Sequence, residues 1–544
     1  MPNTEGDATD LDAAQRDRQF RKQMTQNLKA LRDSSAADSA VAPDRETSPP
    51  ASLKKRALSG MRWTISSRVL VQLITWPSTI IVMRLVNPRD YGLVAMSTVV
   101  IGFVSLFGEP GLAAGLVQTR ALREETSRAA SAVIILLNLI LFAGLEVAAS
   151  GLAAWFREPE LTFVIRVASL SLLMTAIATV PQAHLDRNLC FRETALALVA
   201  GNLVGSLTTI ALALLGFGVW ALVFGTLVLS GVRSMLMIGY HGGLVWPDLS
   251  RGLQPLRHLL HFSAHVISIR ILWYWATNVD LIILGRLTHS AAIGSYSVGA
   301  NLAAIPGDKA MEAVNRVSFP TLSRLHTEPA QFNAAYERIL RMLALYGFLV
   351  AWGMAAVAPE FVHVVLSDKW HLAVVPLAML SIVAPIRMLT AFQATVNTTA
   401  GVPQAATTVL TLTSLLLPVG IVIGARVNGI NGAAISWVVI CPLLFLLSTF
   451  LTCRVTHRSM RQNFRQILIP FIAGSCMVAV TCLVRVVLSV YLPAVVLLCL
   501  ELVAAACTFF GTVKLLDSAL LSDAFKLSRE LLRPRNTATE ELAP

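Results

Sequence analysis

The sequence predicts an all-α protein that crosses a membrane about fourteen times, and three observations lead to this fold class. Of the 544 residues, 55% are apolar and only 14% are charged. The mean hydropathy is +0.65. The charged residues gather near the two ends of the chain and in short clusters between long apolar runs. This pattern is typical of polytopic membrane proteins and excludes a string of soluble domains.

The apolar runs are long enough to cross a bilayer as helices. A hydrocarbon core of roughly 30 Å needs about twenty mostly apolar residues, and fourteen runs meet that length. The predicted spans are residues 58–84, 91–118, 129–152, 161–183, 194–215, 217–239, 259–285, 290–312, 335–357, 372–396, 403–425, 431–453, 466–489 and 491–513.

The charged segments predict how the chain is oriented, because loops rich in Lys and Arg stay on the cytoplasmic side. A polar tail, residues 1–57, precedes the first span, so a cleavable signal peptide is not expected. Lys and Arg are abundant in this tail, in the C-terminal tail (residues 517–544) and in alternate loops. We therefore expect both termini to be cytoplasmic. The same bias explains the net charge of +12 without a nucleic-acid partner.

An internal repeat relates the first and seventh spans. Residues 68–92 align without gaps with residues 270–294. Two arginine pairs and one glycine pair carry most of the match: Arg68 with Arg270, Arg84 with Arg286, and Gly92 with Gly294. The repeated unit holds six helices, an even number, so both copies enter the membrane in the same direction. Parallel lobes of this kind are a transporter architecture, with the substrate path between them.

The offset of the repeat predicts the domain organisation. An N-lobe with helices 1–6 and the following loop covers residues 58–258, and a C-lobe with helices 7–12 covers residues 259–460. Two further helices, over residues 461–516, lie outside the duplication.

The motifs of common catalytic sites are missing from the sequence. It has no GxxxxGK[ST] loop for nucleotide phosphates, no HExxH or GxSxG motif, and no paired Cys and His ligands. The seven cysteines form no CxxC pair. The predicted outer loops are short, the longest running from about residue 358 to 371. We therefore expect no catalytic residue, no metal and no cofactor, and we predict that the chain is not an enzyme.

Arginines inside the predicted spans are candidates for substrate binding, because a charge near the bilayer centre costs roughly 2.5–3.5 kcal/mol on insertion scales. Arg68 and Arg270 occupy equivalent positions in the two repeats, so a pseudo-twofold axis would place them on opposite walls of one cavity. Guanidinium groups bind phosphate oxygens in bidentate fashion. Arg166 and Arg387, in the fourth helix of each half, form a similar pair. The alternative is that each arginine locks a helix by pairing with a carboxylate or carbonyl.

The intramembrane acids have other candidate roles. Asp280 follows Arg270 by ten residues and could bind a coupling proton or cation, or neutralise an arginine. Glu109 and Pro110 lie at an expected helix break that could act as a hinge, although packing against another span is an alternative. Asp308 could form a cytoplasmic gate or belong to a solvated helix end.

Several short motifs resemble a known family. They are Arg84-Leu85, Asp90-Tyr91-Gly92-Leu93, Phe107-Gly108, Gly111-Leu112, Val117-Gln118 and Val317-Ser318-Phe319-Pro320-Thr321-Leu322-Ser323. The chain from about residue 55 to 515 resembles the bacterial polysaccharide transporter family of the multidrug/oligosaccharidyl-lipid/polysaccharide flippase superfamily, and within it the exporters of colanic acid and succinoglycan.

The resemblance implies two six-helix lobes plus two helices, in the bacterial inner membrane. It also implies export of an undecaprenyl-pyrophosphate-linked repeat unit for exopolysaccharide or lipopolysaccharide synthesis, by alternating access. Arg68 and Arg270 would hold the pyrophosphate while the polyprenyl tail stays among membrane lipids. A polysaccharide polymerase and a chain-length regulator are expected partners.

Three other functions stay open at this point. A drug or small-molecule exporter of the same superfamily would need acidic residues in an apolar cavity, whereas most of the charges within the spans are arginines. A membrane glycan polymerase, ligase or acyltransferase would need a large outer loop with catalytic residues, and none is visible. A non-transporting scaffold would leave the insertion cost of the arginines unexplained.

Overall fold

The computed structural model of the chain describes residues 50–108, 111–118, 123–248, 250, 257–325, 328–518 and 520–522. In these residues the regular secondary structure is helical throughout, which confirms the predicted all-α class. Contacts divide the chain into two units, Met1–Met61 and Arg62–Pro544. The account below concerns the second unit.

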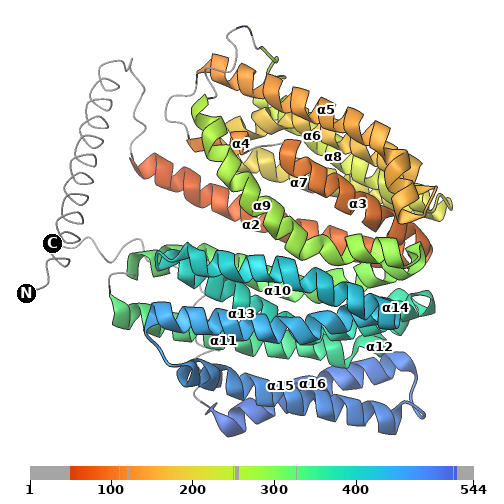
Figure 1. Cartoon of the computed structure of the whole chain (residues 1–544), viewed down its shortest axis with the longest axis vertical. Coiled ribbons are helices and arrows are strands. Elements are labelled where there is room, and N and C mark those ends of the chain that lie inside the picture. The colour runs from red at the N-terminus through yellow and green to blue at the C-terminus, as the bar shows by residue number, and fades with distance from the viewer. Residues whose placement is uncertain are drawn as a thin grey trace, which may run out of the picture. The chain divides into compact units, whose positions relative to one another are not determined.

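The helices of the first half follow one another with short connections (Figure 1). They are α2 (Pro50–Leu85), α3 (Pro88–Gly108), α4 (Leu112–Gln118), α5 (Glu124–Phe156), α6 (Leu161–Arg187), α7 (Phe191–Leu214) and α8 (Val219–His241).

The second half continues in the same way. Its helices are α9 (Arg257–Leu287), α10 (Ser290–Leu325), α11 (Pro329–Ala356), α12 (Ala358–Phe361), α13 (Val374–Thr399), α14 (Pro403–Thr456), α15 (Met460–Leu488) and α16 (Ala494–Leu516). Between α12 and α13 lie a single π-helical turn (Val362–Leu366) and a 3-10 helix (Asp368–Ala373). Every predicted span overlaps one of the observed helices.

Eleven helices in the described part of the chain are long and apolar enough to cross a membrane, so the protein is a multi-pass membrane protein. One of them, α14, has 54 residues and would be about 80 Å long if straight, at 1.5 Å per residue. It is interrupted at Asn428 and Gly429, whose backbone angles are not helical. Gly429 has a φ of 52°, a conformation that glycine adopts without steric cost. The two parts of α14 correspond to the two predicted spans 403–425 and 431–453.

The two parts of α14 fold back on each other at a glycine contact. A Cβ atom on Gly424 would lie 2.2 Å from the carbonyl oxygen of Gly432, so the two backbones touch. Small residues permit such close approach of membrane helices. The interruption therefore turns one long helix into an antiparallel pair.

The two largest of the buried apolar clusters in the described residues join helices from different parts of the chain. The larger cluster draws on α3, α5, α6, α9, α10, α13 and α14, so it joins the first half of the chain to the second. The smaller one packs α11 and α13 against α15 and α16. Figure 1 shows α15 and α16 beside α11, in agreement with their contacts.

Candidate functional site

The two repeats touch where α3 crosses α10, near the first residues of both helices. A Cβ atom on Gly92 would lie 1.8 Å from the carbonyl oxygen of Ser290, and one on Gly294 would lie 1.8 Å from that of Pro88. The two glycines are the pair aligned by the repeat, and each lets the other helix approach. This contact belongs to the predicted outer end, meaning the end of the bundle that holds the α2–α3, α5–α6, α9–α10 and α11–α13 connections.

The aligned arginines of the same repeat also link the two halves at this end. Arg84, at the end of α2, donates to the carbonyl of Val365 at 2.9 Å and to that of Val364, in the connection between α11 and α13. Arg286, at the end of α9, donates to the carbonyl of Trp155 at the end of α5 at 2.9 Å. Each arginine therefore binds main-chain oxygens of the opposite half.

The connection between α11 and α13 makes further contacts with α2 and α3. The indole of Trp370 is fully buried, donates to the carbonyl of Met83 at 2.8 Å and meets the ring of Tyr91 edge-on at 5.2 Å. Lys369 donates to the carbonyl of Arg84 at 2.6 Å. Two donors of the second half thus satisfy carbonyls at the end of α2.

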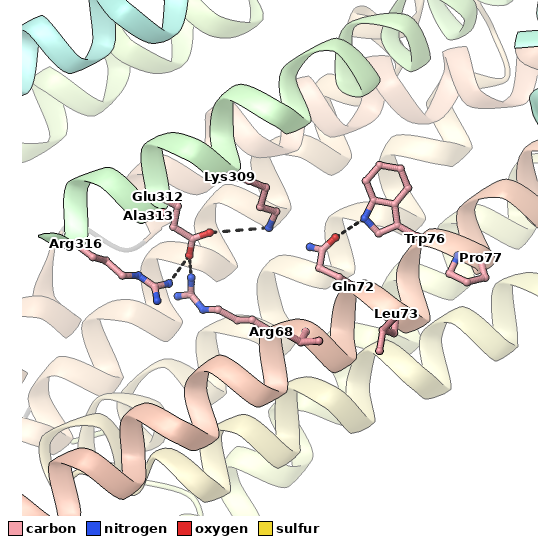
Figure 2. Close-up of a pocket in the computed structure, with 10 residues that line it drawn as sticks. Arg68, Gln72, Leu73, Trp76, Pro77, Lys309, Glu312, Ala313 and Arg316 are labelled. Carbon is pink, nitrogen blue, oxygen red and sulfur yellow. Dashed lines mark hydrogen bonds and ion pairs between the residues drawn. The ribbon is translucent and has the colours of Figure 1, made fainter. Parts of the chain in front are cut away.

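A cavity of about 690 Å³ is lined by residues of α2 and α10, and Figure 2 shows its lining side chains. Arg68 lies on α2, about 26 Å along the helix from Leu85. At the wall of the cavity Glu312 forms ion pairs with Arg68, with Arg316 at 2.6 Å and with Lys309 at 3.9 Å. The charged lining groups are three cations and one carboxylate, and the side chains are between 38% and 50% exposed.

The rest of the cavity lining is mostly apolar. It consists of Val69, Gln72, Leu73, Trp76, Pro77 and Ala313. The Trp76 indole donates to the Gln72 side-chain oxygen at 2.6 Å, as Figure 2 shows. The cavity thus combines a positively charged end with an aromatic and aliphatic wall.

The four arginines predicted as substrate ligands have different surroundings. Arg68 lines the cavity and is paired with Glu312. Its repeat partner Arg270 is exposed and makes no hydrogen bond or ion pair with any residue that the structure describes. Arg166 lies 3.6 Å from Glu146 of α5. The cavity wall itself brings together Arg68, Lys309 and Arg316.

Arg387 belongs to a polar cluster in the second half of the chain. Its guanidinium lies over the ring of Trp437, 4.3 Å from the centroid, and acts electrostatically on both Asp280 and Asp308. Asp280 is buried and accepts hydrogen bonds from the Tyr296 hydroxyl at 2.9 Å and from the Leu281 amide at 2.8 Å. Asp280 thus has the buried, hydrogen-bonded surroundings of a structural or ion-binding carboxylate, whereas Asp308 is exposed.

The predicted hinge residues Glu109 and Pro110 lie outside the described residues. The helices on either side are described: α3 ends at Gly108, and α4 begins at Leu112. Between them Gly111 has a φ of 68°. The predicted span 91–118 is therefore made of two helices.

Sequence reasoning gave Arg316 no role beside Arg68. Lys309, Glu312 and Arg316 are separated by three and four residues, a spacing that places them on one helical face. That periodicity was visible in the sequence. The approach of α2 that adds Arg68 to the cluster was not.

The fold is that of a polytopic all-helical membrane protein. A solved structure described as lipid II flippase MurJ, inward closed conformation, superposes with a TM-score of 0.66. It is 13% identical in sequence and covers 88% of this chain and 100% of that chain. At this identity the likeness concerns the fold alone.

The family model for polysaccharide biosynthesis proteins matches residues 81–375, more than half of the chain, and the chain belongs to this family. An uncharacterized membrane protein in the cps region of Klebsiella pneumoniae is 23% identical over 88% of this chain and 99% of its own length. Lipopolysaccharide biosynthesis protein WzxC of Escherichia coli strain K12 is 23% identical over 77% of this chain and 86% of its own length. The predicted family is thereby confirmed.

Proposed function

We propose that this protein is a flippase that moves an undecaprenyl-pyrophosphate-linked oligosaccharide across the bacterial inner membrane for polysaccharide synthesis. The observation that carries the proposal is the cavity, where Arg68, Lys309 and Arg316 surround a single carboxylate beside an apolar wall. Membership in the polysaccharide biosynthesis family supports the same class of substrate, and the fold is one that a lipid II flippase also has.

The cation cluster suits a pyrophosphate. Glu312 pairs with Arg68, Lys309 and Arg316, and a diphosphate would bring more negative charge and more acceptor oxygens than one carboxylate. Displacement of Glu312 by the ligand would leave the cations paired at every stage. Glu312 thus lowers the net positive charge of the site and leaves the cations able to bind an anionic headgroup.

The sugar head and the polyprenyl tail of the proposed substrate would contact surfaces other than the cation cluster. Trp76 and Gln72 give an aromatic face and an amide, a combination able to stack on a sugar ring and bond its hydroxyls. The polyprenyl tail would stay among membrane lipids. Arg270, Arg166 and Arg387 are proposed as further contacts for the headgroup as it moves, and Arg270 is exposed and available for such a contact.

The proposed transport uses two lobes, residues 58–258 and 259–460, followed by helices over 461–516. With the cytoplasmic termini that the Lys and Arg distribution predicts, the contact between the lobes at Gly92 and Gly294 and the cavity farther along α2 and α10 support an inward-facing state. Rocking of the lobes would open the outer end. Asp280 is the proposed ion-coupling residue, with Glu109, Pro110 and Asp308 as hinge or gate positions. The role involves no catalysis by this chain, and a polymerase and a chain-length regulator are its proposed partners.

The test is the leaflet distribution of lipid-linked oligosaccharide in cells with wild-type protein, no protein, Arg68→Ala, Arg316→Ala or Arg270→Ala, with expression measured in each. We expect the intermediate to accumulate on the cytoplasmic side in cells without the protein and in cells with Arg68→Ala or Arg316→Ala, the two variants of cavity residues. The same result for Arg270→Ala would support its proposed contact with the headgroup. Arg465→Ala, which changes an exposed arginine outside the cavity, is the matched control and should export normally. Normal export without the protein, in cells shown to lack another flippase, would refute the proposal.

A further inference from the structure

A buried cluster of two glutamates and one arginine joins α15 and α16 to the rest of the second half. Arg485 of α15 lies 2.7 Å from Glu360 of α12 and 3.2 Å from Glu501 of α16. It also donates to the carbonyl of Ala356 at the end of α11. The Glu501 side chain is fully buried, and that of Glu360 is 10% exposed. No part of this cluster belongs to the cavity or to the Asp280 site.

The charges of the cluster do not balance when both carboxyls are ionised. One guanidinium neutralises one carboxylate, and the charged groups that act on Glu501 are Arg485 and Glu360. Its immediate neighbours on α16 include the buried Leu497 and Leu498. Burying an unpaired charge in such surroundings costs several kcal/mol, and two carboxylates that share a site cannot both ionise freely.

The geometry supplies a place for one proton. Glu501 Oε2 is buried and accepts no hydrogen bond from a donor among the described residues. The guanidinium of Arg485 brings the second carboxyl to the same place, because it contacts Glu360 at 2.7 Å and Glu501 at 3.2 Å. Two carboxyl groups can bond to each other only when one of them carries a proton, because an ionised carboxylate is an acceptor alone.

We propose that Glu360 and Glu501 form a proton-binding site. One proton, taken from water, forms an O–H bond on one carboxyl and is donated to the other. Arg485 then neutralises the single negative charge that remains. The site differs in place and composition from the proposed coupling residue Asp280, which lies on α9 and pairs with Tyr296.

The proton at Glu360 and Glu501 would also affect the contact between the two halves of the chain. Glu360 begins the connection between α11 and α13, and farther along it Val364 and Val365 accept hydrogen bonds from Arg84. Loss of the proton would set Glu360 and Glu501 in repulsion and loosen this connection on the side facing α15 and α16. If the proposed transport function holds, protonation would therefore favour the closed outer end.

The first experiment is infrared difference spectroscopy of the full-length protein in lipid nanodiscs, titrated with pH in the absence of substrate. We expect wild type to show the carbonyl band of a protonated carboxyl that disappears at high pH. Glu501→Gln and Glu360→Gln should each remove this band. Glu337→Gln, which changes a carboxylate paired one-to-one with Arg458, is the matched control and should keep it.

Thermal unfolding of the same samples gives a second readout. The proton is bound in the folded state and released by an unfolded carboxyl above about pH 4.3. Raising the pH from there to the point where the band disappears should lower the wild-type melting temperature by about 1–2 °C per pH unit. The Glu501→Gln protein should lose less than half as much.

A titrating band that keeps its full wild-type intensity in both glutamine variants would overturn the proposal, as would a wild-type spectrum with no titrating carboxyl. Because no substrate is present, either result bears on the proton site alone. Failure of the leaflet assay would leave the infrared result unaffected, so the two proposals can fail separately.

Discussion

Residues that the internal repeat aligns make similar contacts at the predicted outer end and different contacts near the cavity. At the outer end both members of each aligned pair do similar work: Gly92 and Gly294 allow the backbones to touch, and Arg84 and Arg286 bind carbonyls of the opposite half. In the region of the cavity, Arg68 is paired with Glu312 while its equivalent Arg270 has no partner among the described residues. Similar contacts thus persist where the two halves meet, and the surroundings differ where a ligand would bind.

This difference in contacts indicates how the outer end and the cavity contribute to the proposed transport cycle. Contacts at the outer end involve main-chain atoms and a fully buried tryptophan, which suits a surface that must close in one way. The charged groups of the cavity are partly exposed and mutually paired, which suits a surface that exchanges one set of partners for another. The predictions below test this contrast, from the largest expected effect to the smallest.

The largest effect is expected for Gly92→Ala, which places a methyl group against the Ser290 carbonyl. Separating α3 from α10 should disfavour the closed outer end by about 1–3 kcal/mol, the usual cost of overpacking. Spin labels at Leu215 and Val427, both exposed, would report a longer distance in a cysteine-free background. Gly144→Ala is the control, because nothing lies within 4 Å of that position. An unchanged distance in Gly92→Ala would show that this contact does not hold the outer end closed.

Glu312→Gln should strengthen anion binding in the cavity. The change removes the carboxylate that competes for Arg68, Arg316 and Lys309. With partly exposed pairs the gain should be about 1 kcal/mol, or about fivefold in Kd. Calorimetry with pyrophosphate measures it. The control is Glu124→Gln, which breaks the exposed Glu124 and Arg128 pair outside the cavity. Weaker binding in Glu312→Gln would mean that this carboxylate orients the cations rather than competing for them.

Arg84→Ala removes two hydrogen bonds across the outer contact, and Arg286→Ala removes one. Since these side chains are partly exposed, we expect the closed outer end to lose about 1 kcal/mol for Arg84 and less for Arg286. The same pair of spin labels would show the open population rising in that order. Arg426→Ala changes an exposed arginine without a partner among the described residues and should have no effect. The reverse order of the two variants would contradict the hydrogen-bond explanation.

The smallest effect on stability is expected for Arg270→Ala. An exposed side chain with no partner in the described part of the chain should change the free energy of unfolding by no more than about 0.5 kcal/mol. Thermal unfolding in detergent measures this, with Arg68→Ala beside it. A large loss of stability in Arg270→Ala would make that arginine a structural residue and remove it from the proposed headgroup contacts.

Much of the fold could be predicted because it depends on local properties of the chain. Span length and apolarity placed a helix at every predicted span, and the expected separation of spans 403–425 and 431–453 corresponds to the interruption of α14 at Asn428 and Gly429. Much of the site could not. The pairing of Arg68 with Glu312 joins α2 to α10, and the Arg485 cluster joins Glu360 to Glu501, across sequence separations that periodicity does not address.

The sequence by itself determined that the chain is an all-α membrane protein of the polysaccharide biosynthesis family. Hydropathy and short motifs depend on residues that are close in the sequence, so they can be recognised without knowing how the helices pack. The tertiary structure alone decided which charges meet. The energy of a charge in a membrane depends on its neighbours within a few ångströms, and those neighbours come from helices far apart in the chain. Arg68 and Arg270 look alike in the sequence, and only the ion pair of Arg68 with Glu312 of α10 distinguishes them.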